Sequence, residues 1–270
     1  MIPTIVPILA FALPVITTTP EPELLQQGFD SMYNLSFLQA HEDFQTWERK
    51  YPDDPRGPVF DAAAYLFSEF DRLKILQSEF FVDDQTYEGL SRRIPDPKIR
   101  RDFEKALDQS RHLAEARLRR SPNDIDARFA NVLRLGLHAD YLALIQKQNL
   151  AALSEVKQAT QSAEELVKLC PDCYDAYIAI GIENYLLSLK PAPIRWLLHA
   201  TGAQTDRQVG IEKLKLTATR GVFLKPYAQI LLAMAALRQK DVGEARRLLA
   251  DLGTRYPRNP LYRNELDKIR

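Results

Sequence analysis

The chain has 270 residues, of which 46% are hydrophobic and 27% are charged, a balance that is ordinary for a folded protein and argues against a disordered one. Its length allows one large domain or two small ones. Lys plus Arg and Asp plus Glu both number 36, so no excess of charge favours nucleic acid or an anionic membrane surface as the partner. Glycine is sparse, at 10 residues, which disfavours strand-and-turn folds and glycine-rich phosphate loops.

The first segment of the chain is apolar. Residues 1–16 carry no charged side chain, but they contain three prolines and are shorter than the ~20 residues that a membrane-spanning helix needs. We predict that residues 1–18 are a signal peptide or an N-terminal hydrophobic segment, followed by one helical domain over residues 20–270. The leader is atypical because the first basic residue is Arg49. The predicted location is periplasmic or secreted, and the alternatives are an uncleaved membrane anchor and a buried N-terminal segment.

Amphipathic helical patterns fill the rest of the chain, and no stretch alternates apolar and polar residues for long enough to be a convincing strand. The expected fold class is therefore all-α. Thr205 or Asp206 is the expected N-cap of one helix, and Gly221 is expected to end that helix in the left-handed conformation. Helices are expected over residues 21–33, 34–50, 59–81, 82–93, 98–120, 125–147, 151–169, 173–187, 194–200, 206–220, 222–238, 242–256 and 261–270.

Four of the breaks between these patterns share one form, in which a proline follows the end of a helix and short polar residues help to open the next. The prolines are Pro52, Pro122, Pro171 and Pro257. The residue twelve positions before each proline is small, which lets a neighbouring helix approach closely: Ala40, Ser110, Ala159 and Ala245. The chain is therefore expected to repeat a helix-turn-helix unit.

After Pro171, an aromatic residue, an apolar-small pair and another aromatic residue follow at near-helical spacing, as Tyr177, Ile180-Gly181 and Tyr185. Together with the small residue and the proline, this pattern resembles the tetratricopeptide repeat. The resemblance is best over residues 155–185 and 241–266, and the prolines are spaced less regularly than that family's period of about 34 residues. In this respect the chain is similar to irregular, exported repeat proteins of bacteria.

The resemblance implies a right-handed α-solenoid of antiparallel helix pairs, acting as a non-catalytic scaffold or adaptor that binds a protein or peptide, in the cell envelope. Candidate binding residues on the concave face are Tyr174, Tyr177, Asn184 and Tyr185, whose side chains combine apolar area with polar tips. One alternative is a small-ligand binder or enzyme, which would have a deep pocket between the regions of Tyr65 and Tyr185. Another is a structural component of an envelope assembly, which would use its outer faces.

The only cysteines, Cys170 and Cys173, stand in the sequence CPDC. A redox pair is expected to follow a strand, whereas the segment before Cys170 has a helical pattern. A zinc site normally needs four ligands, and the histidines are scattered singly, at His41, His112, His138 and His199. A local disulfide that staples the turn and two unpaired cysteines are the remaining interpretations.

We expect no catalytic residue, metal or cofactor. His138 and Asp140 lie two positions apart and therefore point to different faces of a helix. The carboxylate pairs Glu164-Glu165 and Asp83-Asp84 are of a kind common on helix faces and ends. The basic helix over residues 98–120 lacks stacking aromatic residues, so a solvated face is expected there and no nucleic acid. Two aromatic clusters are expected to pack in the core: Phe60, Tyr65, Phe67, Phe70, Phe80 and Phe81, and Tyr174, Tyr177, Tyr185 and Trp196.

Overall fold

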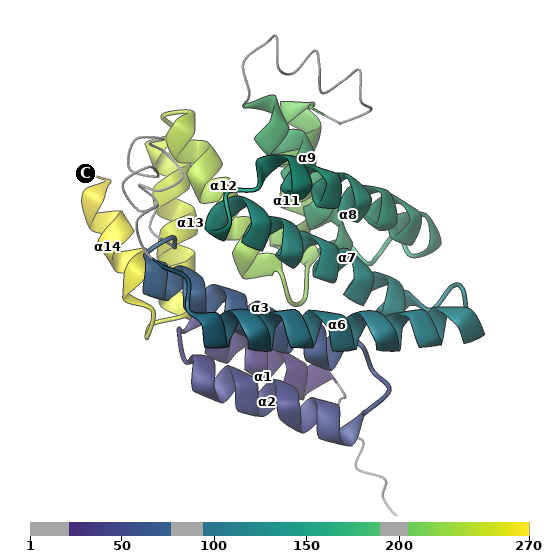
Figure 1. Cartoon of the computed structure of the whole chain (residues 1–270). Coiled ribbons are helices and arrows are strands. Elements are labelled where there is room, and N and C mark those ends of the chain that lie inside the picture. Colours follow the sequence, from purple (N-terminus) through teal and green to yellow (C-terminus); the bar gives the residue numbers. More distant parts are fainter. Residues whose placement is uncertain (1–21, 77–93, 190–204, 270) are drawn as a thin grey trace, which may run out of the picture.

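The computed structural model describes residues 22–76, 94–189 and 205–269, and in these ranges the chain is helical and has no strand (Figure 1). The all-α prediction is confirmed for this part of the chain. The predictions for residues 1–18, 82–93 and 194–200 lie outside the described residues, as do Phe80, Phe81, Asp83, Asp84, Trp196 and His199.

The described ranges hold eleven α-helices and two short turns of other helix types. The α-helices are α1 (Pro22–Tyr33), α2 (Phe37–Lys50), α3 (Arg56–Leu73), α6 (Pro97–Arg120), α7 (Ile125–Asp140), α8 (Asn149–Leu169), α9 (Tyr177–Ser188), α11 (Arg207–Arg220), α12 (Lys225–Arg238), α13 (Val242–Arg255) and α14 (Pro260–Lys268). The short turns are the π-helical η1 (Tyr141–Ile145) and the 3₁₀-helical η2 (Tyr174–Ala176).

Several helices begin at a side chain that accepts hydrogen bonds from the exposed backbone N–H groups of the first turn. The Asp206 carboxylate accepts from the N–H groups of Gln208 and Val209, as expected of the N-cap of α11. Other helices begin in the same way, at Asp96, Asp124, Asp241 and Asn259. These polar residues fix where the helices start.

The four proline breaks share one backbone geometry. The residue before each proline donates its N–H to the carbonyl four positions earlier at 2.8 Å, and the residue two positions after the proline donates back across the turn at 3.0 or 3.1 Å. The second set of bonds runs from Asp54 to Tyr51, Asp124 to Ser121, Cys173 to Cys170 and Asn259 to Tyr256. The small residues twelve positions before the prolines are all buried: Ala40, Ser110, Ala159 and Ala245. The turn inferred from the sequence is thus repeated in the structure.

Residues in the left-handed backbone conformation occur at positions that the sequence did not predict. Gly221 has φ −60° and ψ 150°, so the prediction of a left-handed cap there is wrong. A Cβ at Gly221 would lie 2.6 Å from Oδ1 of Asp175 and 2.6 Å from the carbonyl oxygen of Thr217, so the close approach of these atoms explains the glycine. The non-glycine residues with positive φ in the described ranges are Leu35 (58°), Lys74 (63°), Lys147 (61°) and Lys240 (60°).

The observed helix bounds differ from the predicted ones mainly beside these left-handed residues. Leu35 separates α1 from α2, and Lys74 ends α3 through a bond from the N–H of Ile75 to the carbonyl of Phe70 at 2.7 Å. The helix expected over residues 34–50 begins at Phe37, and the one expected over 59–81 runs from Arg56 to Leu73. The helix expected over 125–147 ends at Asp140 and is followed by η1, and the one expected over 222–238 begins at Lys225.

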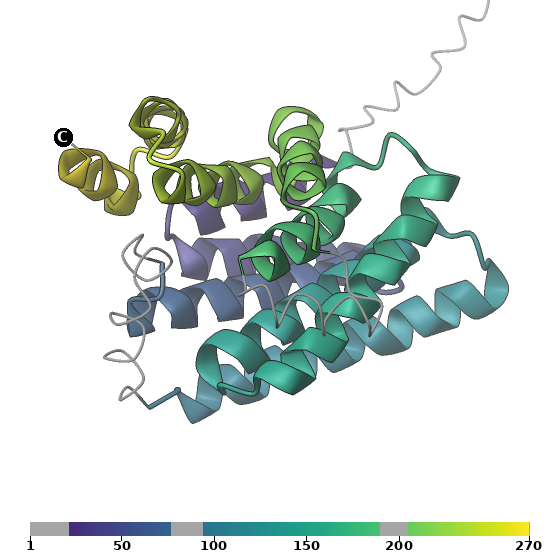
Figure 2. The same cartoon turned by 90° about the horizontal axis from the view of Figure 1, so that it is seen from above.

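Helices that follow one another along the chain pack against each other, and the first helix also meets the last ones (Figures 1 and 2). The Tyr33 hydroxyl of α1 donates to the carbonyl oxygen of Phe223 at 3.2 Å, and Nδ2 of Asn259 donates to the carbonyl oxygen of Tyr33 at 2.9 Å. The rings of Phe29 and Phe223 stack at 5.2 Å. These contacts close the described array on itself.

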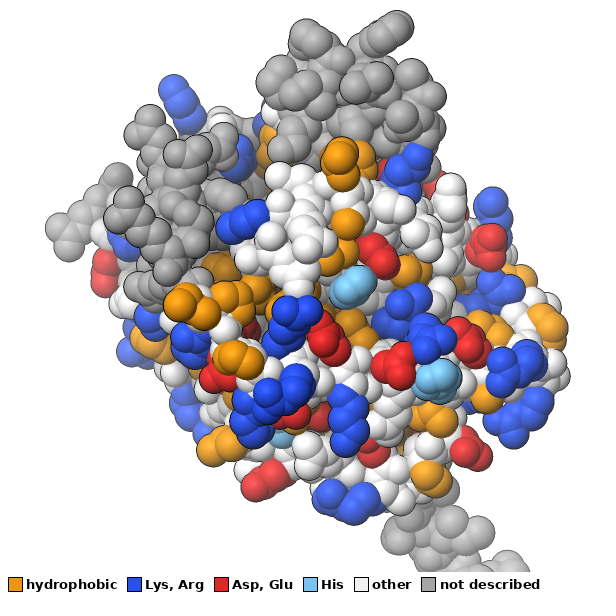
Figure 3. All heavy atoms as spheres, viewed as in Figure 1, with side chains coloured by type: hydrophobic (Ala, Val, Ile, Leu, Met, Phe, Trp, Pro, Cys, Tyr) orange, Lys and Arg blue, Asp and Glu red, His pale blue; other side chains and the backbone are white. Residues whose placement is uncertain are grey.

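The exposed face of α6 carries its charges in pairs. Lys98 lies 2.8 Å from Asp102, and Arg100 lies 2.8 Å from Glu104. Figure 3 shows Lys and Arg side chains mixed with Asp and Glu side chains over this part of the surface. Alternating charges of this kind suit a solvated helix face.

Candidate functional site

A cavity with apolar walls lies between the N-terminal and C-terminal helices. It has two lobes, each with a volume of about 70 Å³. Both lobes are lined by Met32 and Tyr33 of α1, Phe67 of α3 and Tyr227 of α12, so they meet at these four side chains. The two lobes together are called the central cavity below.

Different helices complete each lobe. The first lobe extends from Met234 of α12 toward α13 and α14, where Leu249 and Leu261 line it. The second lobe extends between α7, α8 and α9, where Val132, Val156, Ile178 and Ile182 line it. Because α1, α3 and α12 form the wall that the lobes share, and α1 and α12 lie far apart in the sequence, the central cavity depends on the closure of the array.

Gly136, in the interior of α7, lines the second lobe. A Cβ built on Gly136 would meet no atom within 4 Å, so neither close packing nor backbone conformation requires a glycine there. By contrast, a Cβ on Gly210 would lie 2.6 Å from the backbone nitrogen of Tyr185, where α9 and α11 pack tightly. A glycine inside a helix destabilises it by about 0.5–1 kcal/mol relative to alanine. The effect of Gly136 is to leave the second lobe open.

One carboxyl group faces the second lobe. Oδ2 of Asp140, at the end of α7, accepts a hydrogen bond from the Tyr227 hydroxyl at 3.4 Å. Asp140 keeps some accessible surface because it faces the cavity, and protein atoms surround it on its other sides. This burial raises the pKa of the Asp140 carboxyl to about 7, and the bond from Tyr227 opposes part of the rise. The pKa of Tyr227 is raised well above its ordinary value. Burial is the largest cause, and the nearby Asp140 carboxyl is the next largest.

The other polar side chains of the cavity walls have protein partners. The hydroxyl of Tyr33 and the amide of Asn259 form the closing bonds described above. Glu265, which lines the first lobe, accepts from Nζ of Lys268 at 3.0 Å. No Lys, Arg or His is among the described residues that line the two lobes. Within the described ranges, Asp140 therefore has a tyrosine partner and no basic residue in the cavity wall beside it.

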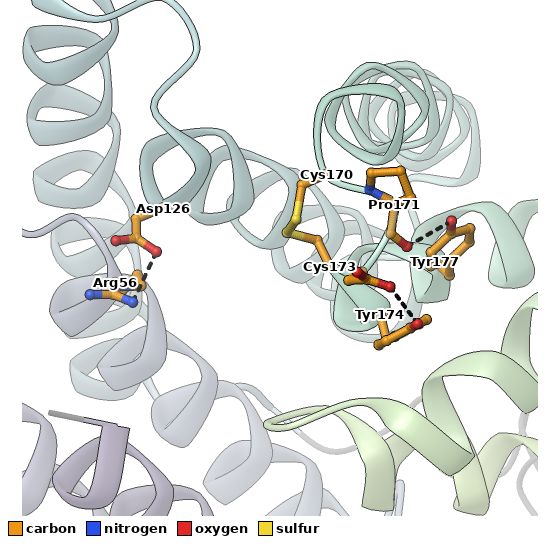
Figure 4. Close-up of a disulfide and its surroundings, with 8 residues drawn as sticks. Arg56, Asp126, Cys170, Pro171, Cys173, Tyr174 and Tyr177 are labelled. Atoms are coloured by element: carbon orange, nitrogen blue, oxygen red, sulfur yellow. Dashed lines mark hydrogen bonds and ion pairs between the residues drawn. A yellow bond between two sulfur atoms is a disulfide. The ribbon is translucent and has the colours of Figure 1, made fainter. Parts of the chain in front are cut away.

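The four predicted binding residues lie in two different environments. Tyr174 and Tyr177 are partly exposed, with ring centroids 6.3 Å apart, and the Tyr177 hydroxyl donates to the carbonyl oxygen of Pro171 (Figure 4). Asn184 and Tyr185 each retain only 2% of their surface. They are buried because α11 covers that end of α9. The structure does not bring the four together on one surface, and none of them lines the central cavity.

Cys170 and Cys173 form a disulfide across the turn between α8 and η2, with Cα atoms 5.4 Å apart (Figure 4). Cys173 occupies the position that the other three proline breaks give to Asp54, Asp124 and Asn259, whose side chains accept a backbone N–H at the start of the next helix. At this break a covalent link takes the place of that polar side chain.

Asp175, in η2, holds the connection between α11 and α12. Its carboxylate accepts the backbone N–H groups of Val222 at 3.0 Å, Phe223 at 3.1 Å and Leu224 at 2.9 Å. Burial raises the pKa of this carboxyl, and the three backbone bonds act in the opposite direction. The start of α12, and with it Tyr227, is thereby fixed against the disulfide-bearing turn.

The described histidines each lie beside a carboxylate. His41 contacts Asp61, and His138 lies 3.2 Å from Glu155. His112 lies 3.3 Å from Asp108 on α6. Within the described residues there is no group of three or more His, Cys, Asp or Glu side chains that could hold a metal ion.

The small-ligand alternative predicted a pocket between the regions of Tyr65 and Tyr185. The structure has a pocket, but neither of these residues lines it. Tyr65 stacks on His41 with centroids 4.1 Å apart, and Tyr185 packs against Gly210. The sequence pattern identified Asp140 only as a neighbour of His138. The signal that was available is a glycine and an aspartate four positions apart in one helix, Gly136 and Asp140, a spacing that places them on one helix face.

Comparison of the sequence with protein-family models and with curated proteins finds no match. The resemblance to the tetratricopeptide repeat therefore stays a prediction. No helix in the described ranges combines the length and the apolarity that crossing a membrane requires.

Proposed function

We propose that this protein binds an apolar ligand in the central cavity. The observation that carries the proposal is a two-lobed cavity whose walls are mostly apolar and aromatic, with one carboxyl–hydroxyl pair facing it. Ligand sites typically combine such walls with a few placed polar groups. Protein cores leave few voids larger than a water molecule, so a lobe left open by Gly136 favours a binding role over incomplete packing.

The proposal includes the architecture that the sequence resemblance implies. We take the helices to form antiparallel pairs of a right-handed, tetratricopeptide-like array, and the shared geometry of the four proline breaks supports this. The contacts of Tyr33 with Phe223 and Asn259 favour an enclosed inner surface over an open groove. An enclosed surface suits a small ligand better than a protein partner. The scaffold role and export stay predictions.

Calorimetric titration with n-octanol tests the proposal. In Gly136→Leu the new side chain enters the second lobe from α7, at a point where a Cβ meets no atom within 4 Å. The variant is therefore expected to fold and to lose the space for a ligand. We expect the wild type to bind n-octanol and Gly136→Leu to bind it at least about tenfold more weakly, a difference of about 1.4 kcal/mol.

Gly243→Leu is the matched control. Gly243 is an exposed residue of α13 outside the cavity walls, and a Cβ there would meet only Oδ1 of Asp241, at 3.7 Å. This variant should bind n-octanol as the wild type does. A Gly136→Leu variant that binds n-octanol as tightly as the wild type does would contradict the proposed function, and so would a wild type that binds no ligand with an octyl chain.

A further inference from the structure

We propose that the ligand of the central cavity is an amphiphilic amine, an apolar chain ending in a protonated amino group that pairs with the carboxylate of Asp140. This inference rests on the proposed function, because it assumes that an apolar ligand occupies the central cavity. It adds the chemistry of the ligand's polar end.

The charges in the cavity wall favour a cationic ligand. The described walls of the central cavity contain two acidic residues, Asp140 and Glu265, and no basic one. Glu265 has Lys268 as a partner, whereas the hydrogen-bond partner of Asp140 is the neutral hydroxyl of Tyr227. A cationic head group would supply the charge that the wall beside Asp140 lacks.

The free energy of a buried carboxylate also favours a cationic ligand. An ionised carboxyl group in an apolar environment is strongly disfavoured unless an opposite charge pairs with it. The raised pKa of Asp140 reflects this cost, because burial is its largest cause and no basic group among the described residues offsets it. An ammonium group would stabilise the ionised form by direct pairing. An alcohol could offer only a hydrogen bond, and a fatty acid would bring a second carboxyl group to the same place.

The aromatic surface around the carboxyl group suits a cation as well. Tyr33, Phe67 and Tyr227 line both lobes, and the rings of Phe67 and Tyr227 meet edge to face with centroids 5.5 Å apart. Aromatic ring faces attract cations, and this attraction grows when the cation is shielded from water. The same rings provide the apolar wall against which the alkyl chain would pack.

Three ligands with the same alkyl chain separate the alternatives: n-octylamine, n-octanol and n-octanoic acid. Each is titrated calorimetrically into the full chain at about pH 8, where the amine is protonated and Asp140 is largely ionised. We expect n-octylamine to bind the wild type at least about tenfold more tightly than n-octanol. n-Octanoic acid should bind most weakly.

Asp140→Asn removes the charge and keeps the size of the side chain, so the ratio of the amine affinity to the alcohol affinity should fall to about one, since only the charge pairing is lost. The control is Glu165→Gln, which removes a carboxylate from the exposed face of α8, where Glu165 pairs with Arg128. In this control the ratio should stay as in the wild type.

Two results would overturn the inference while leaving the proposed function intact. The first is n-octanol or n-octanoic acid binding the wild type as tightly as n-octylamine, which needs no variant to fold. The second is an unchanged affinity ratio in Asp140→Asn. If none of the three ligands binds the wild type, the proposed function itself fails, and the inference fails with it.

Discussion

Nδ2 of Asn259 donates a hydrogen bond to the carbonyl oxygen of Tyr33 at 2.9 Å across a sequence separation of 226 residues. Oδ1 of the same amide accepts the N–H of Leu261 at 3.0 Å and so begins α14. One side chain therefore starts the last described helix and attaches it to the first. This attachment turns a chain of locally packed helices into a closed array around the central cavity.

Asn259→Ala and Asn259→Ser separate these two roles. Alanine removes the cap and the closing bond, whereas serine keeps an N-cap acceptor but is too short to reach Tyr33. Loss of the closing bond leaves a buried carbonyl group unpaired, which costs about 1–3 kcal/mol, and loss of the cap costs about 1 kcal/mol more. In urea unfolding we expect both variants to be destabilised, Asn259→Ala the more so. A serine variant as stable as the wild type would show that the closing bond contributes little.

Asp175→Ala should be among the most destabilising single substitutions outside the apolar core. It would leave three backbone N–H groups without their acceptor and loosen the start of α12. We expect a loss of about 3 kcal/mol or more in the free energy of unfolding. Asp172→Asn, on the exposed part of the same turn, is the control and should change it by less than about 0.5 kcal/mol. Equal effects of the two substitutions would argue against the anchoring role.

The raised pKa of the Asp140 carboxyl should make the stability of the protein depend on pH. Its carboxyl pKa rises from the ordinary value of 3.8 to about 7 in the folded protein. Below the lower value both states are protonated and Asp140 carries no penalty. As the pH rises from about 3.8 to about 7, the unfolded state loses this proton whereas the folded state keeps it, so stability is progressively lost, and the loss levels off above about 7.

Asp140→Asn has no such titration, so its free energy of unfolding should exceed that of the wild type increasingly as the pH is raised from about 4 to 8, by up to roughly 4 kcal/mol. Thermal unfolding of both proteins across this range measures the difference. A difference that does not vary with pH would mean that Asp140 is well solvated in the folded state.

The disulfide should contribute only modestly. The loop that Cys170 and Cys173 close is very short, and the chain-entropy relation gives about 2 kcal/mol for it. We expect the double variant Cys170→Ala, Cys173→Ala to lower the free energy of unfolding by no more than this amount, measured by urea titration, and to bind n-octanol as the wild type does. Unfolding of the protein upon reduction would instead make the disulfide essential to the fold.

Local features of the fold could be predicted from the sequence because their causes are local. Asp206 was recognisable as an N-cap, and the four proline breaks share hydrogen bonds between residues at most four positions apart. The small residues twelve positions before the four prolines are buried, as the repeat pattern predicted: Ala40, Ser110, Ala159 and Ala245. The left-handed residues were missed because three of them are lysines, which have no special preference for that conformation, whereas glycine was expected to mark it.

The central cavity could not be predicted, because it depends on pairs such as Tyr33 with Phe223, which lie 190 positions apart. The sequence does not show which distant residues meet, so an aromatic cluster in it predicts core packing and not a cavity. The same limit explains the prediction that grouped Tyr177 with Tyr185. Helical spacing places them on one face, but only the packing of α11 decides which part of that face is covered.

The most direct test of the account is the position of an apolar ligand in a crystal of the protein. Crystals soaked with n-hexyl bromide would reveal the ligand through the anomalous scattering of bromine. The account predicts a bromine peak inside the central cavity, in contact with Phe67 or Tyr227, and its loss in Gly136→Leu. Bromine peaks confined to the outer surface of the wild-type protein would contradict it.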